Sequence, residues 1–207
     1  FGGNSVEHEI SILSLIQASH AINYQKYDIL PVYVTKDCRF WVGPNFTDLK
    51  TFQKKKFRHY EVVFYNCNKQ LFIKVLGYLP RRYQKAIDVV LPIVHGKNVE
   101  DGSLAGYFNI LNAAFASCSV LEAALFQNKN YTKKALNLVG IKTLPSYSFR
   151  YNSFRGNRHL IIKDCEVLDY PLIVKPVSLG SSIGIKIAEN REDLINAILY
   201  ASNYDDE

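Results

Sequence analysis

The 207-residue chain contains no methionine, one tryptophan and only four cysteines, and the cysteine pattern limits the kinds of site that it can form. No two cysteines form a C-x-x-C pair, and no histidine cluster has the spacing of zinc ligands. The sequence therefore predicts reduced thiols of a cytoplasmic protein rather than a disulfide framework or a zinc site. The cysteines are Cys38, Cys67, Cys118 and Cys165.

Long apolar runs are also missing. None approaches the ~20 residues that a helix needs to cross a bilayer, and no signal peptide is visible at the start. We therefore expect no membrane insertion. Phe1-Gly2-Gly3 is typical of the last residue of a strand followed by a loop. Together with the lack of methionine, this opening predicts an internal fragment of a longer protein.

Positive charge is present without a nucleic-acid-binding motif. The formal net charge is +6, with basic clusters at 54–58 and 81–82. In the absence of an RNA- or DNA-binding motif, we interpret these clusters as solvated faces and expect no nucleic-acid partner. The positive balance suits small anionic ligands. Hydrophobic residues make up 48% of the chain and charged residues 21%, which is typical of a globular protein long enough for two small domains.

The most informative stretch is 170–184, which combines an apolar strand, a lysine and a loop of small residues. Leu172–Val174 would place Lys175 at the strand end, and Pro176 stops the strand. A loop of small residues can bring several N–H groups and hydroxyls close to phosphate oxygens. An equally good interpretation from this segment alone is a glycine-serine turn between two strands, with a solvated lysine. The small residues of the loop are Gly180, Ser181, Ser182 and Gly184.

Two other places attract attention because of their position. The apolar run Ala86–Val94 predicts a parallel strand covered on both faces, and His95 follows it, where ligands bind in open α/β sheets. A histidine merely hydrogen-bonded in a loop would explain the same position. Glu7 and Glu9 fall in the first turn of a predicted helix, where carboxylates favour the positive helix end. That structural role is their simplest explanation.

Periodicity and turn residues predict two domains of alternating helices and strands, with a boundary near Gln127. The apolar side of the first helix is expected to hold Ile10, Leu13, Leu15 and Ile16. Residues 151–158 are expected to be irregular, and 160–167 are ambiguous. Helices are predicted at 6–22, 102–111, 119–126, 129–138 and 191–202, strands at 27–35, 40–42, 60–65, 70–76, 86–94, 143–149, 172–174 and 185–187, and a polar loop at 97–101.

Four motifs occur in order along the chain. They are Gly2–Ser11, His95-Gly96 with Glu100-Asp101-Gly102, Lys129 with Lys133, and Val174-Lys175-Pro176 with Gly180–Gly184. Together they resemble the D-alanine:D-alanine ligase family, over nearly the whole chain apart from 38–85. The resemblance implies an α/β fold. Residues 1–127 would form an amino-terminal, parallel-sheet, Rossmann-like (pre-ATP-grasp) substrate domain, and 128–207 part of an ATP-grasp α+β domain.

The resemblance also implies a reaction. The family joins two D-alanines with ATP through a D-alanyl phosphate, giving the dipeptide used in peptidoglycan. ATP and Mg²⁺ would be the cofactors, D-alanine and ATP the small-molecule partners, and a homodimer through the amino-terminal domain is implied. Nothing in Phe40, Trp41 and Phe46 by itself marks a contact patch. The family's metal ligands lie in a segment that these 207 residues do not contain, so we expect no metal site and no ligase activity from this polypeptide alone.

Site residues follow from the same resemblance. Lys129, Lys175 and the loop with Gly180, Ser181 and Ser182 would contact ATP. Glu7 would pair with the ammonium of the first D-alanine, because an unpaired buried charge is costly. Ser181 would orient Glu7, and His95 would lie beside the first substrate.

One departure and two alternatives remain. Many relatives have Met-Asp-Lys where this chain has Gln127-Asn128-Lys129, so a neutral amide replaces an acidic neighbour. A related ATP-grasp ligase with a different second substrate would fit the same residues, and so would a non-catalytic ligand-binding remnant.

Overall fold

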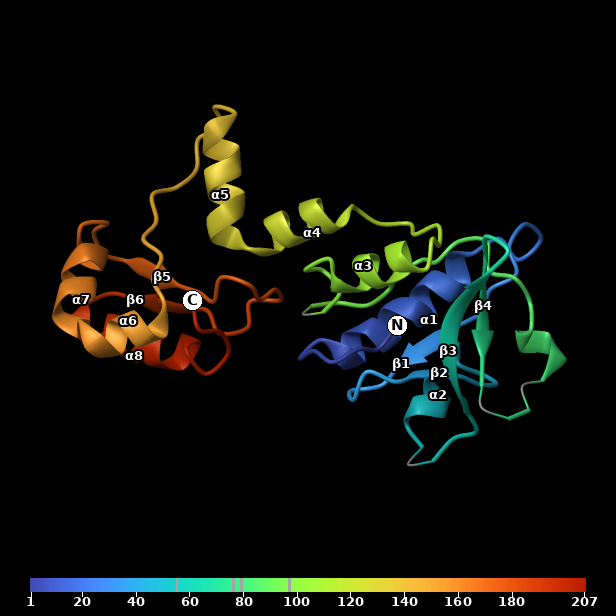
Figure 1. Ribbon diagram of the computed structural model, residues 1–207. Helices are drawn as coiled ribbons and strands as arrows, with labels where there is room; N and C mark the ends of the chain where they lie inside the picture. Colours follow the sequence, from blue (N-terminus) through green and yellow to red (C-terminus); the bar gives the residue numbers. More distant parts are fainter. Residues whose placement is uncertain (55, 76, 79, 97) are drawn as a thin grey trace. The chain divides into compact units, whose positions relative to one another are not determined.

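The computed structural model describes residues 1–54, 56–75, 77–78, 80–96 and 98–207. It separates into two compact units, Phe1–Ala123 (unit 1) and Ala124–Glu207 (unit 2), whose elements are labelled in Figure 1. Three sequence predictions include residues outside this description. They are Lys55 in the basic cluster, Leu76 at the end of a predicted strand, and Lys97 in the loop after His95.

Unit 1 contains an antiparallel sheet in the order β1-β2-β3-β4. Along β3, Val62 and Phe64 are buried while Val63 is exposed, so one face of the strand packs on the core. Asn68 and Lys69, which join β3 to β4, both have positive φ, as a two-residue type I′ hairpin requires. The strands are β1 (Val32–Val34), β2 (Phe40–Val42), β3 (Tyr60–Cys67) and β4 (Gln70–Lys74).

Parallel pairing in unit 1 consists of single bridges. Gly2 bridges both Val34 and Val94 in parallel, which places the first residues of the chain between β1 and the segment that precedes His95. Val90 makes another parallel bridge, to Phe115. These bridges accord with the predicted α/β class, but the described sheet is antiparallel, so the parallel sheet expected for residues 1–127 is represented only by isolated bridges.

The prediction that residues 86–94 are covered on both faces is wrong. Val89 and Leu91 are 52% and 58% exposed, whereas Val94 is buried. The segment pairs through single bridges rather than a continuous ladder, so side chains on one side of it remain at the surface of the described structure.

Helix α1 (His8–Ala21) buries a different side from the one expected. Ile12 and Leu15 are buried, but Ile10 and Leu13 are 54% and 42% exposed. Ser11 is fully buried because its hydroxyl accepts a hydrogen bond from Gly2 N–H (2.7 Å) and donates to the Ile93 carbonyl. A polar, hydrogen-bonded contact replaces apolar packing there. The other helices of unit 1 are α2 (Leu49–Phe52), a 3₁₀ turn η1 (Arg81–Tyr83) and α3 (Ser103–Ile110).

Helix α4 (Val120–Gln127) crosses the division between the units, and helix α5 (Lys129–Leu138) follows it in unit 2. The predicted break between them is confirmed. Asn128 caps α5, its side chain accepting from the N–H groups of Asn130 and Tyr131. A reciprocal capping box begins α4, because Ser119 N–H donates to Glu122 and Glu122 N–H donates to Ser119 Oγ.

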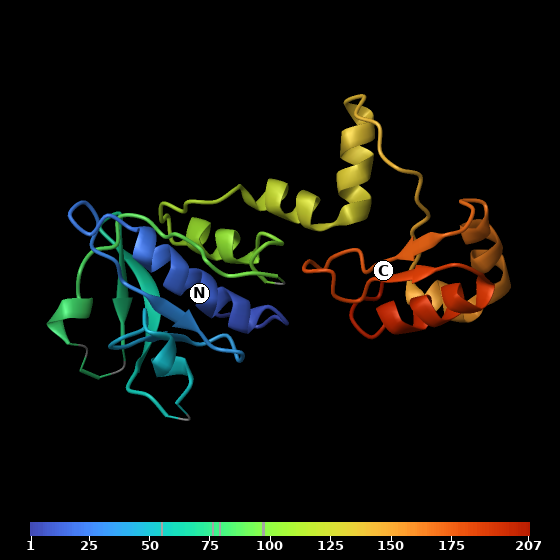
Figure 2. The same cartoon turned by 180° about the vertical axis from the view of Figure 1, so that it is seen from behind.

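The rest of unit 2 is an antiparallel hairpin covered by helices. β5 (Leu172–Val174) pairs with β6 (Lys186–Ala188), and α8 (Arg191–Ala201) lies against both strands, as Figures 1 and 2 show. Asn190 caps α8 by accepting from Asp193 N–H, as predicted. Helices α6 (Tyr151–Gly156) and α7 (Arg158–Glu166) complete the unit.

Two predictions for unit 2 are wrong. Residues 143–149 form no strand, because no described strand pairs with them, and 151–158, expected to be irregular, contain α6. The ambiguous 160–167 are mostly α7. The helical pattern spans both helices and is interrupted at Asn157, which hides it in the sequence. The buried side chains of the two helices are Phe154, Ile161, Ile162 and Cys165.

Each unit has its own core. Unit 1 has one apolar cluster around β2, β3, β4 and α3 and a second around α1, which is rich in aromatic rings. Unit 2 has one, built on α6, α7, α8 and the hairpin. Among the described helices, none is long and apolar enough to cross a membrane.

Candidate active site

In unit 1, the loop before α1 meets the segment that ends at His95. Ser5 connects the two, because its hydroxyl donates to the His95 carbonyl (2.7 Å) and accepts from Glu7 N–H (3.2 Å). Ser11 adds the bond to Ile93 from one turn further along the helix. The structure therefore brings two of the sequence-predicted residues, Glu7 and His95, into one neighbourhood.

Glu7 is buried, with 7% of its surface exposed, at the residue that precedes α1. Its carboxylate lies against the backbone of Gly96, where an added Cβ would be 2.9 Å from Glu7 Oε2. Gly96 also has φ +83°, a conformation that side chains rarely adopt. The close approach of this glycine is what leaves room for the carboxylate.

His95 is half-buried, with one ring nitrogen within hydrogen-bond distance of a hydroxyl and a carboxylate near the other. Ser14 Oγ on α1 lies 3.0 Å from Nε2, and Glu100 Oε1 lies 3.9 Å from Nδ1. A carboxylate on the Nδ1 side favours the proton there, which leaves Nε2 to accept from the Ser14 hydroxyl. The ring orientation is thus fixed by residues from α1 and from the loop before α3.

His8 fixes the same loop from the other side. Its Nδ1 donates to the Gly3 carbonyl (2.6 Å), and in the neutral ring Nε2 then accepts from the Tyr33 hydroxyl (2.8 Å). Burial, followed by the charges of Glu9 and Asp37, raises the pKa of Tyr33, so this hydroxyl keeps its proton.

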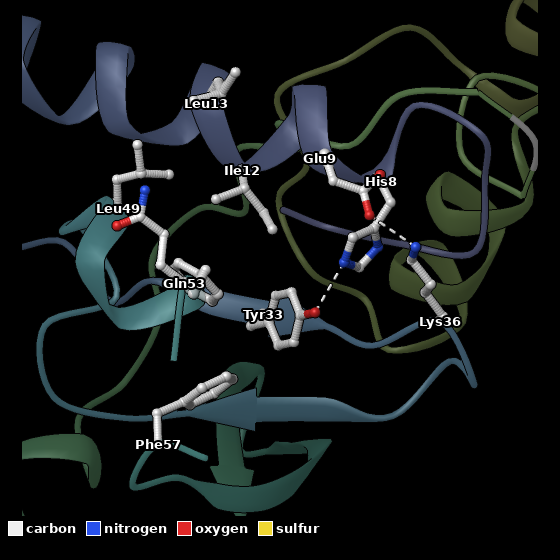
Figure 3. Close-up of a pocket in the computed structure, with 10 residues that line it drawn as sticks. His8, Glu9, Ile12, Leu13, Tyr33, Lys36, Leu49, Gln53 and Phe57 are labelled. Carbon is white, nitrogen blue, oxygen red and sulfur yellow. Dashed lines mark hydrogen bonds and ion pairs between the residues drawn. The ribbon is translucent and has the colours of Figure 1, made fainter. Parts of the chain in front are cut away.

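His8 and Tyr33 line a pocket of about 440 Å³, and Glu9 and Lys36, which also line it, form an ion pair at 2.8 Å. Figure 3 shows these side chains between α1 and α2. The ion pair holds the pKa of Glu9 below its usual value through the hydrogen bond from Lys36. Glu9 is thus held by an ion pair with Lys36, a structural contact that differs from the helix-end role suggested by the sequence.

In unit 2, Lys175 follows β5 and the small-residue loop connects it to β6. Ile183 N–H bonds to the Gly180 carbonyl (3.1 Å), which makes the loop tip a turn, and Ser181 and Ser182 have φ of 48° and 58°. Gly184 is required by its surroundings, because a Cβ there would lie 2.5 Å from Pro176 Cγ. The loop is thus compact and its backbone is held in a left-handed conformation near its tip.

Three lysines gather beside this loop. Burial, and then the charge of Lys175, lowers the pKa of Lys129, while Asp205 acts in the opposite direction. The pKa of Lys133, one turn further along α5, is lowered by the same two causes. The Lys129 ammonium donates to the carbonyls of Val177 (3.3 Å) and Leu179. Like charges held this close are stabilised by a bound polyanion.

Sequence reasoning missed several residues that hold these groups in place. Ser5 and His8 in unit 1 could have been noticed as polar residues inside the first motif, whereas Ser14 lies three residues beyond its end. Gln127 and Asp205 in unit 2 gave no signal beyond the departure at Gln127. Within the part of the chain that the structure describes, no three His, Cys, Asp or Glu side chains are placed to hold a metal ion.

Comparison with known proteins identifies the family. The model of the D-ala D-ala ligase N-terminus matches residues 1–118, and that of the D-ala D-ala ligase C-terminus matches residues 135–207. The first alone covers more than half of the chain. The protein therefore belongs to the D-alanine–D-alanine ligase family, and the predicted α/β fold with part of an ATP-grasp domain is confirmed.

Individual relatives agree. The D-alanine–D-alanine ligase of Enterococcus hirae is 33% identical over 208 residues, which cover 99% of this chain and 57% of the relative. The solved VanG D-Ala:D-Ser ligase of Enterococcus faecalis is 31% identical with a TM-score of 0.78, over 100% of this chain and 59% of that one. The D-alanine–D-alanine ligase of Helicobacter pylori is 28% identical with a TM-score of 0.79, over 100% and 62%. The chain thus spans about three fifths of the length of these relatives.

Proposed function

We propose that the protein to which this chain belongs joins two D-alanines in an ATP-dependent reaction that supplies a dipeptide for peptidoglycan. The observation that carries the proposal is the group of Lys129, Lys133 and Lys175 beside a small-residue loop, in a chain of this family. Bound ATP would supply the phosphoryl group that activates the first D-alanine as D-alanyl phosphate.

The residues of unit 1 would bind the first amino acid. Glu7 offers a buried carboxylate to its ammonium, and His95, held by Ser14 and Glu100, would lie beside it. Burial makes the ion pair specific, because a ligand without a free ammonium would cover the Glu7 carboxylate without neutralising its charge.

The residues of unit 2 would bind the nucleotide. Lys129 and Lys175 would neutralise phosphate oxygens, and the loop with Gly180, Ser181 and Ser182 would cover them. The lowered pKa of Lys129 fits this role, because a phosphate replaces repulsion between lysines with attraction. Ser181 would also orient Glu7. We assign residues 1–127 to the substrate domain and 128–207 to the nucleotide domain.

Mg²⁺ belongs to the proposal as a cofactor of the complete enzyme. The described residues do not fit it, because they contain no suitable group of three ligands. No step is therefore assigned to the metal in this chain, and we expect no ATP- and D-alanine-dependent phosphate release from the 207 residues alone.

The test uses substitutions in the complete protein. Lys175→Ala should abolish turnover and weaken nucleotide binding. Glu7→Gln should raise the KM for the first D-alanine roughly 10- to 100-fold and leave nucleotide affinity unchanged, since a charge-assisted hydrogen bond is lost. The matched controls are Lys142→Ala, an exposed lysine of unit 2, and Glu9→Gln, two residues from Glu7. Normal kinetics in both site variants would refute the assignment.

A different second substrate is the alternative that one observation favours. The solved D-Ala:D-Ser ligase matches this chain with a TM-score of 0.78, close to the 0.79 of the Helicobacter pylori D-alanine–D-alanine ligase. Product analysis of the complete protein with D-alanine, D-serine and D-lactate decides between them. No product with any of these would favour a non-catalytic binding protein.

The proposal includes a cytoplasmic location and a homodimer formed through unit 1. Cell fractionation and the solution mass of the complete protein test these two points. A monomer at micromolar concentration would remove the dimer from the proposal.

A further inference from the structure

We propose that Gln127 and Asp205 are positioning residues that grip the main chain of Ser178, one at its C=O and one at its N–H, and thereby fix the stem of the phosphate loop. The stem is Val177–Leu179, and the tip is 180–184. The inference rests on the proposed nucleotide site, since it explains how the loop over that site is held.

Two hydrogen bonds hold the main chain of Ser178, one at its C=O and one at its N–H. Gln127 Nε2, at the end of α4, donates to the Ser178 carbonyl at 2.7 Å. Ser178 N–H donates to Asp205 Oδ2, also at 2.7 Å, from the segment after α8. Both hydrogen bonds are short, and one of them ends on a charged group, which strengthens it.

The neighbouring peptides of the stem are also bonded to groups outside the loop. The Val177 carbonyl accepts from Lys129 N–H (3.1 Å), and Val177 N–H donates to the Glu207 carbonyl (3.0 Å). The Lys129 ammonium reaches the carbonyls of Val177 and Leu179. The tip differs, because Ile183 N–H bonds back within it to Gly180. A stem held from outside can carry a tip that moves over the phosphates.

Asp205 has a second effect on the same site. Its charge raises the pKa of Lys129 against the effects of burial and Lys175. It therefore helps to keep the Lys129 ammonium charged while its oxygen holds Ser178. Gln127 holds the Ser178 carbonyl without adding a charge, which keeps the positive balance that phosphate requires.

A fixed stem should improve nucleotide affinity, because ordering the loop on binding then costs less conformational entropy. The loss of either side chain should loosen the stem before any nucleotide is present. Two consequences can therefore be measured separately, the protection of stem amides and the affinity for nucleotide.

The experiment uses three substitutions in the complete protein. Gln127→Met removes the donor at nearly constant volume. Asp205→Ala removes both the acceptor and the charge, and Asp205→Asn keeps an acceptor oxygen but removes the charge. Gln17→Met, on the exposed side of α1, is the control for a methionine replacing a glutamine.

Amide hydrogen exchange without nucleotide gives the first readout, and calorimetry with Mg²⁺ and a non-hydrolysable ATP analogue gives the second. Gln127→Met and Asp205→Ala should speed exchange at 177–184 and weaken binding roughly tenfold, with the KM for D-alanine unchanged. Asp205→Asn, which keeps an acceptor for the Ser178 N–H, should keep both the exchange protection and the affinity. Gln17→Met should behave as the unsubstituted protein.

The outcomes separate the two proposals. If the unsubstituted protein binds the analogue and both Gln127→Met and Asp205→Ala match it in exchange and affinity, the grip is refuted. If no protein binds the analogue but exchange at 177–184 changes as expected, the grip stands and the nucleotide site fails. Should Asp205→Ala fail to fold, the near-isosteric Gln127→Met decides alone.

Discussion

At the scale of single residues, the candidate site depends on backbone positions that leave room for charged side chains. Gly96 shows this best, because it combines positive φ with the Glu7 carboxylate at the place where its Cβ would be. Gly140 has nearly the same φ (+81°) but no atom within 4 Å of an added Cβ. Substitutions at the two glycines can therefore distinguish the effect of backbone strain from the effect of contact with a neighbouring side chain.

Gly96→Ala should displace Glu7 and impair use of the first D-alanine. Steady-state kinetics of the complete protein should show a KM for D-alanine at least tenfold higher, with nucleotide affinity unchanged. Gly140→Ala, which meets only the strain of about 1 kcal/mol, should reduce stability slightly and leave the KM unchanged. Equal effects of the two substitutions on the KM would contradict the role given to Gly96.

Cysteine reactivity is a second property of single residues. Burial raises the pKa of Cys165 to about 11, whereas Cys38, Cys67 and Cys118 are exposed. Iodoacetamide at pH 8 should therefore label three thiols in the native protein and the fourth only after denaturation. Peptide mass spectrometry identifies the labelled positions. Labelling of Cys165 at the rate of the others would mean that the α6–α7 packing is open.

The charge of Lys129 should make nucleotide affinity depend on pH. Its pKa is lowered in the free protein by burial and by Lys175, and a bound phosphate would raise it. Phosphate binds the ammonium form, so affinity should be fully present below the lowered pKa and fall as the pH rises through it. Calorimetry across alkaline pH measures this, with Lys129→Arg as the control that keeps its charge. A parallel decline in both proteins would assign the effect to another group.

At the scale of elements, α8 carries much of the packing in unit 2. Leu194 is 1% exposed on the face toward the hairpin, and Leu199 on the same helix is 40% exposed. Leu194→Ala should lower the free energy of unfolding by about 2–5 kcal/mol, and Leu199→Ala by less than about 1 kcal/mol. Urea unfolding followed by far-ultraviolet circular dichroism measures both. Similar losses would mean that the exposed side of α8 is covered.

The helices and strands also show which parts of the structure can be predicted from the sequence. Helix α5 has the predicted bounds, 129–138, because the Asn128 cap and the charged surface positions act locally. The strand predicted at 143–149 is wrong, because a strand needs a partner that local sequence does not reveal. For the site, the motifs gave Glu7, His95 and the lysines, but Gln127 and Asp205 come from contacts between distant segments. No periodicity signals such contacts.

At the scale of the whole molecule, two units with separate cores imply that a ligand can stabilise one more than the other. The chain's single tryptophan, Trp41, lies in β2 of unit 1, so its fluorescence reports on that unit. The proposed phosphate contacts, in contrast, are all in unit 2. Ligand binding stabilises the state that binds by mass action.

A saturating ATP analogue should therefore protect amides of residues 124–207 more strongly than those around Trp41. At a hundred times the dissociation constant, the stabilisation of the binding unit is about 2.7 kcal/mol. Hydrogen exchange by mass spectrometry, read together with tryptophan fluorescence during thermal unfolding, tests this. Equal protection in both units would show that they unfold as one.

The stem of the phosphate loop has a consequence for natural variation. Residues 177–179 are held through their main-chain groups, so their own side chains can change among relatives without loss of those bonds. Selection should instead act on the side chains at 127, 129 and 205, because these bond to the stem from outside it. Among relatives with a hydrogen-bond donor at 127, sequence drift should therefore be freer within the stem than at 127, 129 and 205.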